Sequence, residues 1–227
     1  MRTELHAALP GATAPTRIVL LPAALQGVAD LLAAGFADAV RHRGLAVDLL
    51  LVDPQLRDLT DRSVLTRLHA DVVLPARAAG CTALWLGGIS LGGFMALLYA
   101  ASYPAELTGL CLLAPYLGNH MITSEIAAYR SMADWQAATA ERVDVLSEER
   151  RLWRYAVSAE ARQLDWHLAY GRDDRFAAAQ RLLAAQLPAG SVQEREGGHD
   201  WPAWQRQWLG FLDRLPQPPA TLAASAS

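Results

Sequence analysis

One serine of this chain lies where its hydroxyl could act as a nucleophile. Ser90 follows the short apolar run 83–86, and Gly88 and Gly92 stand two residues away on either side. The pattern G-x-S-x-G is typical of a nucleophile elbow, a tight turn from a strand into a helix that holds the serine out toward a base. Such a turn strains the serine backbone by about 1–3 kcal/mol, and glycines, which have no Cβ, let neighbouring chain pass close by. The expected chemistry is attack by Ser90 on a carbonyl carbon.

Two other interpretations of this turn are open. It could be a glycine-rich connection between a strand and a helix, without any chemistry. The spacing of Gly87 and Gly92 also matches a phosphate-binding loop, but Gly93 stands where that motif requires a lysine.

A nucleophilic serine needs a base, and the base needs an acid that sets its tautomer and orientation. The histidines after Ser90 are His120, His167 and His199. His167 lies inside an apolar, strand-like run, which favours a histidine of the core. His120 precedes the late strands and falls in a segment of mixed composition. His199 lies in a Gly-Gly-His loop after the last predicted strand.

The chain resembles the α/β-hydrolase family in three motifs at the ends of predicted strands: the elbow at Ser90, Gly171-x-x-Asp174, and the loop of His199. In that family the triad follows the chain order serine, acid, histidine. The resemblance spans roughly residues 17–215. It implies that Ser90 is the nucleophile, Asp174 the acid and His199 the base.

Asp173 competes with Asp174 for the role of the acid, because both follow the same predicted strand. Neighbouring loop residues usually point in different directions, so we expect only one to reach the ring of His199. The family spacing from Gly171 selects Asp174. Asp173 is then a loop residue whose carboxylate bonds nearby backbone N–H groups.

The resemblance also implies an oxyanion hole of two backbone N–H groups. One donor is Leu91, the residue after the nucleophile. The other comes from the loop after the first strand, where many family members carry His-Gly and this chain has Pro22-Ala23-Ala24. Pro22 has no N–H to donate. Aligning Pro22-Ala23 with His-Gly makes Ala24 the donor, with Ala23 and Leu25 as alternatives.

Strands and helices alternate along the chain, and each strand is almost entirely apolar, which predicts a parallel sheet covered on both faces. Such sheets bind ligands outside the carboxyl ends of their strands, where the elbow lies. The fold class is therefore α/β and doubly wound, with a mostly parallel sheet of about six strands. Because the N-terminus looks too short for two extra leading strands, we expect a trimmed α/β-hydrolase fold with a helical cap insertion. Strands are expected near residues 17–21, 45–52, 83–86, 107–113, 164–170 and 191–195, and helices near 28–43, 63–79, 94–101, 176–187 and after 199.

The domain boundaries follow from shifts in composition. Residues 1–215 form a single domain, and the segment 116–163, in which charges crowd and aromatics are interleaved, resembles the cap of the family. The alternative is an ordinary set of helices on the body of the domain. The Pro-, Ala- and Ser-rich tail 216–227 is expected to be disordered.

The cap offers weak candidates for substrate binding. Trp135 and Trp153 could line an apolar acyl pocket, or could equally belong to the core of the cap. Three arginines, at positions 150, 151 and 154, could meet an anionic substrate, but a solvated helix face is the favoured interpretation.

The composition narrows the partners. The net charge of −3 gives no support for a nucleic-acid partner. The apolar run 18–25 is far shorter than the roughly 20 residues that span a membrane, and the N-terminus lacks the features of a signal peptide. We therefore expect a cytoplasmic protein with two reduced cysteines, no metal, and no cofactor. The oligomeric state is not predicted.

Taken together, the motifs predict a serine hydrolase that cleaves a carboxylic ester or thioester through an acyl-enzyme on Ser90, with a small acyl compound as substrate. One alternative is an acyltransferase that uses the same triad. Another is a hydrolase relative that binds a small molecule without turnover, although such a protein has no need to keep all three residues.

Overall fold

The computed structural model describes residues 1–9, 11–54 and 63–216. The predicted disordered tail 216–227 lies outside these residues, apart from Pro216. In the described part of the chain, no helix combines the length and the hydrophobicity needed to cross a membrane.

The centre of the molecule is a seven-stranded sheet with the strand order β1-β3-β2-β4-β5-β6-β7. All neighbouring strands from β3 to β7 are parallel, and only β1 is antiparallel. The predicted mostly parallel, doubly wound sheet is thus confirmed, and its six expected strands are all present. The strands are β1 (Arg2–His6), β2 (Thr16–Leu21), β3 (Val47–Asp53), β4 (Ala83–Ile89), β5 (Gly109–Leu113), β6 (Asp165–Gly171) and β7 (Val192–Arg195).

The seventh strand, β1, was missed by the sequence analysis, which expected about six strands. Four of its five residues are polar and three are exposed, because β1 pairs only with β3 at the edge of the sheet. An edge strand of this kind lacks the continuous apolar run that marked the buried strands.

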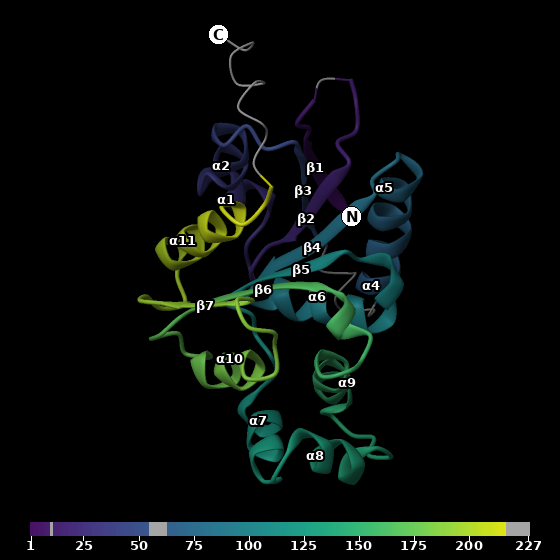
Figure 1. The fold of residues 1–227 in the computed structure, drawn as a ribbon, viewed down its shortest axis with the longest axis vertical. Helices are drawn as coiled ribbons and strands as arrows, with labels where there is room; N and C mark the ends of the chain where they lie inside the picture. Colours follow the sequence, from purple (N-terminus) through teal and green to yellow (C-terminus); the bar gives the residue numbers. More distant parts are fainter. Residues whose placement is uncertain (10, 55–62, 217–227) are drawn as a thin grey trace.

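Helices cover both faces of the sheet (Figure 1). One apolar cluster joins one face to α1 (Val28–Ala33), α2 (Phe36–His42) and α11 (Trp201–Leu212). The larger cluster lies on the opposite face, under α6 and its neighbours. The helices of that face are α4 (Val64–Leu68), the π-helical turn η1 (His69–Val73), α5 (Leu74–Ala78), α6 (Leu91–Ser102), α9 (Ser147–Ala156) and α10 (Ala177–Ala184), with short 3-10 turns at Pro104–Glu106 and Ala161–Gln163.

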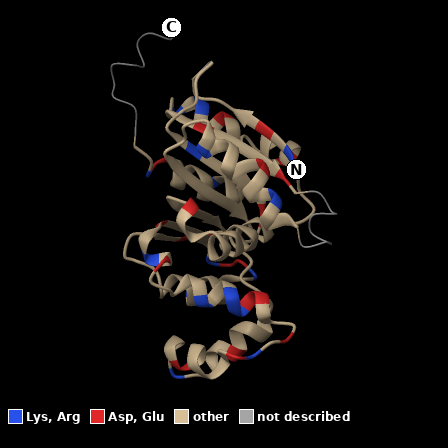
Figure 2. Cartoon of the chain, turned by 90° about the vertical axis from the view of Figure 1, so that its right-hand side faces the viewer, with Lys and Arg blue, Asp and Glu red and all other residues tan. Residues whose placement is uncertain are grey.

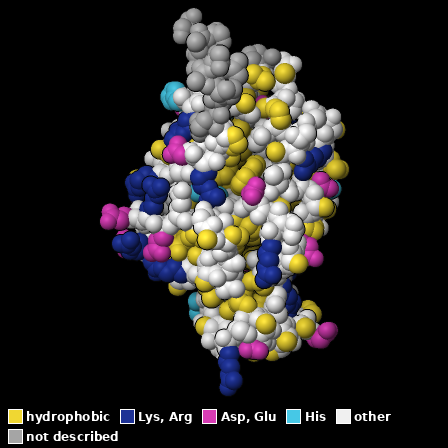
Figure 3. Space-filling view, in the orientation of Figure 1, with side chains coloured by type: hydrophobic (Ala, Val, Ile, Leu, Met, Phe, Trp, Pro, Cys, Tyr) yellow, Lys and Arg dark blue, Asp and Glu magenta, His cyan; other side chains and the backbone are white. Residues whose placement is uncertain are grey.

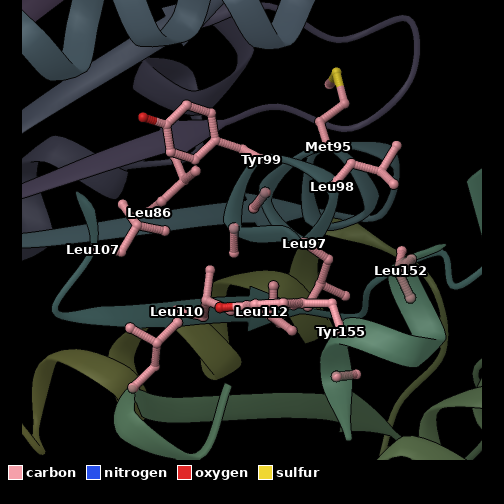
Figure 4. Close-up of a cluster of buried hydrophobic side chains, with 14 of the residues drawn as sticks. Leu86, Met95, Leu97, Leu98, Tyr99, Leu107, Leu110, Leu112, Leu152 and Tyr155 are labelled. Atoms are coloured by element: carbon pink, nitrogen blue, oxygen red, sulfur yellow. The ribbon is translucent and has the colours of Figure 1, made fainter. Parts of the chain in front are cut away.

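The core between α6 and the sheet holds the elbow in place. Figure 4 shows Leu97 and Leu98 of α6 above Leu110 and Leu112 of β5, with Leu152 and Tyr155 of α9 alongside. These side chains are at most 8 % exposed. Because α6 begins at the residue after Ser90, this packing fixes the helix that starts at the elbow.

The expected helix over 28–43 is interrupted and forms α1 and α2. Gly35 has φ 77° and lies between them. A residue in the left-handed region cannot continue an α-helix, and glycine adopts it without a Cβ clash.

The segment 116–163, predicted as a cap, is helical. Its helices α7 (His120–Ala127) and α8 (Met132–Thr139) lie farthest from the sheet, whereas α9 packs on α6 (Figure 1). Charged residues are concentrated on α9, whereas α7 and α8 carry one acidic residue each (Figure 2). Over the face drawn in Figure 3, arginines and carboxylates are interspersed rather than gathered by sign.

Candidate active site

Ser90 lies at the junction of β4 and α6, with φ 52° and ψ −112°. A non-glycine residue with positive φ is strained. Three backbone hydrogen bonds hold it there: its N–H donates to Leu113 O at 3.1 Å, and its carbonyl accepts from Tyr116 N–H at 2.9 Å and from Phe94 N–H at 3.2 Å. The elbow expected from the sequence is therefore present in the backbone geometry.

The two flanking glycines are required by close contacts. A Cβ on Gly88 would lie 2.1 Å from the carbonyl carbon of Gly92, and one on Gly92 would lie 2.5 Å from Leu21 O. Real Cβ atoms do not approach this closely, so any side chain at either position would push the turn apart.

The three side chains assigned to the triad form one chain of hydrogen bonds. His199 Nε2 is 2.9 Å from Ser90 Oγ, and His199 Nδ1 is 2.8 Å from Asp174 Oδ2. With the Nδ1 proton donated to Asp174, Nε2 of a neutral ring is free to accept the serine proton. The arrangement can therefore activate a serine hydroxyl.

Asp174, not Asp173, reaches the histidine. The side chain of Asp174 is buried, and its second oxygen accepts the N–H of Phe176 at 2.8 Å. Asp173 is exposed, and its backbone N–H donates to Gly197 O at 3.1 Å.

The loops of the acid and the base pass each other at Gly171. A Cβ at this position would lie 2.1 Å from Gly197 O. This glycine therefore lets the loop of His199 approach the end of β6, where Asp174 follows.

Three neighbours of the triad were not singled out as site residues. Gln180 is buried, and its Nε2 donates to Asp174 Oδ2 at 3.4 Å and to Pro115 O at 3.1 Å. The rings of Phe176 and Trp204 meet the His199 ring edge-on, at 5.0 Å and 5.2 Å between centroids. A glutamine on the apolar face of α10 was the available signal for Gln180. Trp204 is a buried residue of α11.

The loop after β2 lies beside the first turn of α6, as the expected oxyanion hole requires. Ala24 and Leu91 line one cavity of about 250 Å³. Leu91 is the first residue of α6, so its N–H has no acceptor within the helix. Ala24 lies in a turn closed by a hydrogen bond from Gln26 N–H to Ala23 O, in which Leu25 has φ 63°.

The two tryptophans suggested for substrate binding lie in the core. Trp135 and Trp153 are 0 % exposed, and their indole N–H groups donate to Glu125 Oε1 at 2.9 Å and Leu117 O at 3.0 Å. Neither lines a cavity found next to the triad. The alternative that both belong to the core of the cap is the one this packing favours.

The other histidines lie away from the triad. His167 is buried in β6 and packs on Phe211, with 5.2 Å between ring centroids. His120 is exposed at the start of α7. Within the described residues, no three His, Cys, Asp or Glu side chains are placed to hold a metal ion.

The chain is similar to known proteins in family and in fold. A family model described as "Putative esterase" matches residues 70–215. No curated protein sequence matches the chain.

Solved structures resemble the chain in fold. An α/β-hydrolase enzyme, MGS-MChE2, from a sediment metagenome of the Mar Chica lagoon has a TM-score of 0.58 at 17 % identity, over 87 % of this chain and 85 % of that one. FphF, a fluorophosphonate-binding serine hydrolase of Staphylococcus aureus, has a TM-score of 0.57 at 12 % identity, over 87 % and 82 %. A monoacylglycerol lipase of Paleococcus ferrophilus has a TM-score of 0.53 at 14 % identity, over 93 % and 97 %.

Proposed function

Because this chain belongs to the putative esterase family, we propose that it cleaves a carboxylic ester or thioester through an acyl-enzyme formed on Ser90. Membership makes it a serine α/β-hydrolase. The observation that carries the proposed mechanism is the continuous hydrogen-bond chain from Asp174 through His199 to Ser90, at 2.8 Å and 2.9 Å.

The first half of the reaction forms the acyl-enzyme. Ser90 Oγ attacks the carbonyl carbon while His199 Nε2 takes the hydroxyl proton, and Asp174 stabilises the resulting imidazolium. The negative oxygen of the tetrahedral intermediate is bound by the N–H groups of Leu91 and Ala24. Collapse of the intermediate breaks the bond to the leaving oxygen or sulfur, which receives the proton from His199.

In the second half, water replaces the leaving group. His199 takes a proton from the water, the oxygen of which attacks the acyl carbon, and collapse returns the proton to Ser90 and releases the acid. If an alcohol or amine entered instead of water, the same residues would perform acyl transfer. Product analysis in the presence of an added alcohol separates the two.

The test is covalent labelling by a fluorophosphonate, the class of reagent that FphF of Staphylococcus aureus binds. We expect mass spectrometry to find the label on Ser90, and Ser90→Ala to lose both labelling and hydrolysis of a short nitrophenyl ester while staying folded. Ser124→Ala is the matched control, because Ser124 is an exposed serine of α7. Labelling of a folded Ser90→Ala protein would refute the mechanism.

A further inference from the structure

A cleft of about 400 Å³ adjoins the triad, between the cap and α10. Tyr116 and His120 belong to its cap wall, and Arg175 and Phe176 to its other wall. One residue of each wall contacts a residue of the triad. The N–H of Tyr116 donates to the carbonyl of Ser90 at 2.9 Å, and the Phe176 ring lies 5.0 Å from the His199 ring. The cleft is thus lined by residues that contact Ser90 and His199, and not by the triad itself.

The rings of this cleft form an aromatic corner. The centroids of Tyr116 and Phe176 are 5.3 Å apart, with the rings nearly perpendicular. On Phe176 lies the guanidinium of Arg175, with Cζ 4.8 Å from the ring centroid. This contact orients a cation over the wall of the cleft without using its N–H groups.

The polar groups of the cleft are mostly donors that remain available. Arg175 is exposed and makes no ion pair or hydrogen bond with any residue that the structure describes. Asn119 uses its Oδ1 to accept the N–H of Met121 at 2.8 Å, which leaves its amide N–H groups to donate. Burial, together with the nearby Glu149, raises the pKa of the Tyr116 phenol, so this hydroxyl stays protonated.

One acidic residue borders the cap wall. A Cβ on Gly118 would lie 2.7 Å from Cγ of Glu149, so this residue packs behind that wall. Arg175 belongs to the opposite wall, beside Phe176. The free cation of Arg175 favours an anionic group on that side of the cleft, away from Glu149.

We propose that this cleft binds the leaving group of an aromatic ester that carries an anionic group, with the ring against Tyr116 and Phe176 and the anion on Arg175. The leaving group is assigned because Phe176 of the cleft wall packs on His199, the residue that must protonate it. The volume suits a substituted phenol. The identity of the bond that breaks rests on the proposed function, whereas the binding of the anion to Arg175 does not depend on it.

Paired esters test the cleft by turnover. The acetate ester of 4-hydroxybenzoate and that of 4-hydroxybenzamide differ in charge but little in shape, and their different intrinsic reactivity cancels when variants are compared. We expect Arg175→Gln to lower kcat/KM for the acid about three- to tenfold relative to the amide, the range for a partly exposed charge pair.

The matched control is Arg172→Gln, which removes the same charge from the same loop. Arg172 is exposed and lies 3.8 Å from Glu194, and it does not line the cleft. It should leave the ratio of the two esters unchanged. An equal change in both variants would reduce the effect to long-range electrostatics and overturn the assignment of Arg175.

Binding without turnover separates this inference from the proposed function. Calorimetry with 4-hydroxybenzoate, 4-hydroxybenzamide and 4-hydroxyphenyl phosphate, on the wild type and on Arg175→Gln, needs no reaction. Tighter binding of either anion than of the amide, lost in Arg175→Gln, supports the cleft, and the stronger of the two anions tells carboxylate from phosphate. Equal binding of the amide and both anions, or binding indifferent to Arg175→Gln, overturns it even if Ser90 proves to be the nucleophile.

Discussion

Asp174 is held by three groups, and this is what distinguishes it from its neighbour. One carboxylate oxygen lies 2.8 Å from Nδ1 of His199 and accepts the side-chain amide of Gln180 at 3.4 Å. The other oxygen accepts the N–H of Phe176 at 2.8 Å. A carboxylate fixed at both oxygens cannot rotate away from the histidine. Its orientation is therefore set before substrate binds, as an acid that fixes a tautomer requires.

The first prediction compares the two adjacent acids. We expect Asp174→Asn to lower ester turnover by about 10⁴-fold, as loss of the triad acid does in serine proteases, because the amide favours the wrong tautomer of His199. Asp173→Asn should keep most of the activity, since Asp173 is exposed and makes no contact with His199 in the structure. The measurement is kcat/KM on one ester near neutral pH, with circular dichroism as the check on folding. An inactive Asp173→Asn protein would shift the acid by one residue.

At the scale of elements, the helical segment 116–163, the predicted cap, is organised around a buried arginine. Arg150 of α9 is 0 % exposed and donates to Glu125 of α7 at 2.6 Å and 2.9 Å, and to Asp144 at 2.6 Å. Hydrogen bonds from Arg150 lower the pKa of Glu125 and of Asp144. The solvated face expected for the three arginines is thus wrong for Arg150, which joins the helices of the cap.

The second prediction concerns the ion pairs of Arg150 with Glu125 and Asp144. Glu125→Gln leaves the buried guanidinium of Arg150 with Asp144 as its remaining acid. Removing one partner of a buried ion pair costs about 3–5 kcal/mol, and we expect the loss of stability to approach this range. Limited proteolysis should cut the cap faster in this variant. Glu148→Gln is the control, because Glu148 forms an exposed pair with Arg151 at 3.3 Å and should change stability by less than about 1 kcal/mol. Equal unfolding midpoints of Glu125→Gln and Glu148→Gln would contradict a stabilising role of the Arg150–Glu125 ion pair.

The stability that the Arg150–Glu125 ion pair contributes depends on pH with a definite sign. Because the folded pKa of Glu125 is lowered, its contribution is present above the pKa of the unfolded chain and is lost as the pH falls through the folded value. The wild type should therefore lose its advantage over Glu125→Gln in acid, below about pH 4.

At the scale of the whole molecule, the residues assigned to the triad follow the carboxyl ends of the strands, whereas a buried titratable group lies inside the sheet. His167 of β6 pairs in register with Cys111 of β5 and packs under Phe211 of α11. Burial first, and then the charge of Arg214, lower the pKa of His167 to about 4. Arg214 lies within 3.2 Å of its Nδ1. The native fold therefore holds this histidine neutral where an unfolded chain would protonate it.

The third prediction follows from this difference. Between about pH 6.5 and about pH 4 the unfolded chain binds a proton at His167 and the folded chain does not, so this residue lowers stability as the pH falls. We expect His167→Leu to lose less stability than the wild type between pH 7 and pH 4.5, measured by urea unfolding. His42→Ala, which removes an exposed histidine of α2, should follow the wild type. Parallel curves for His167→Leu and wild type would refute the effect.

The sequence alone determined the parts of this protein that depend on local pattern. Mostly apolar runs marked five of the seven strands, because a strand buried on both faces is apolar at nearly every position. The predicted strand β7 is mostly polar and, like β1, lies at an edge of the sheet. The residues Ser90, Asp174 and His199 were chosen from short motifs that each follow a strand, and the carboxyl ends of parallel strands meet at one edge of a sheet.

Only the tertiary structure decided the features that arise from contacts between distant residues. Ser90 and His199 are 109 residues apart and meet because β4 and β7 lie in one sheet with the loops crossing at Gly171. The burial of Arg150 and of the two cap tryptophans could not be inferred from composition, since a charged helix face looks the same whether water or a carboxylate from another helix neutralises it. Arg175, whose guanidinium lies on the ring of Phe176, likewise lines a cleft whose two walls are built from separate segments of the chain.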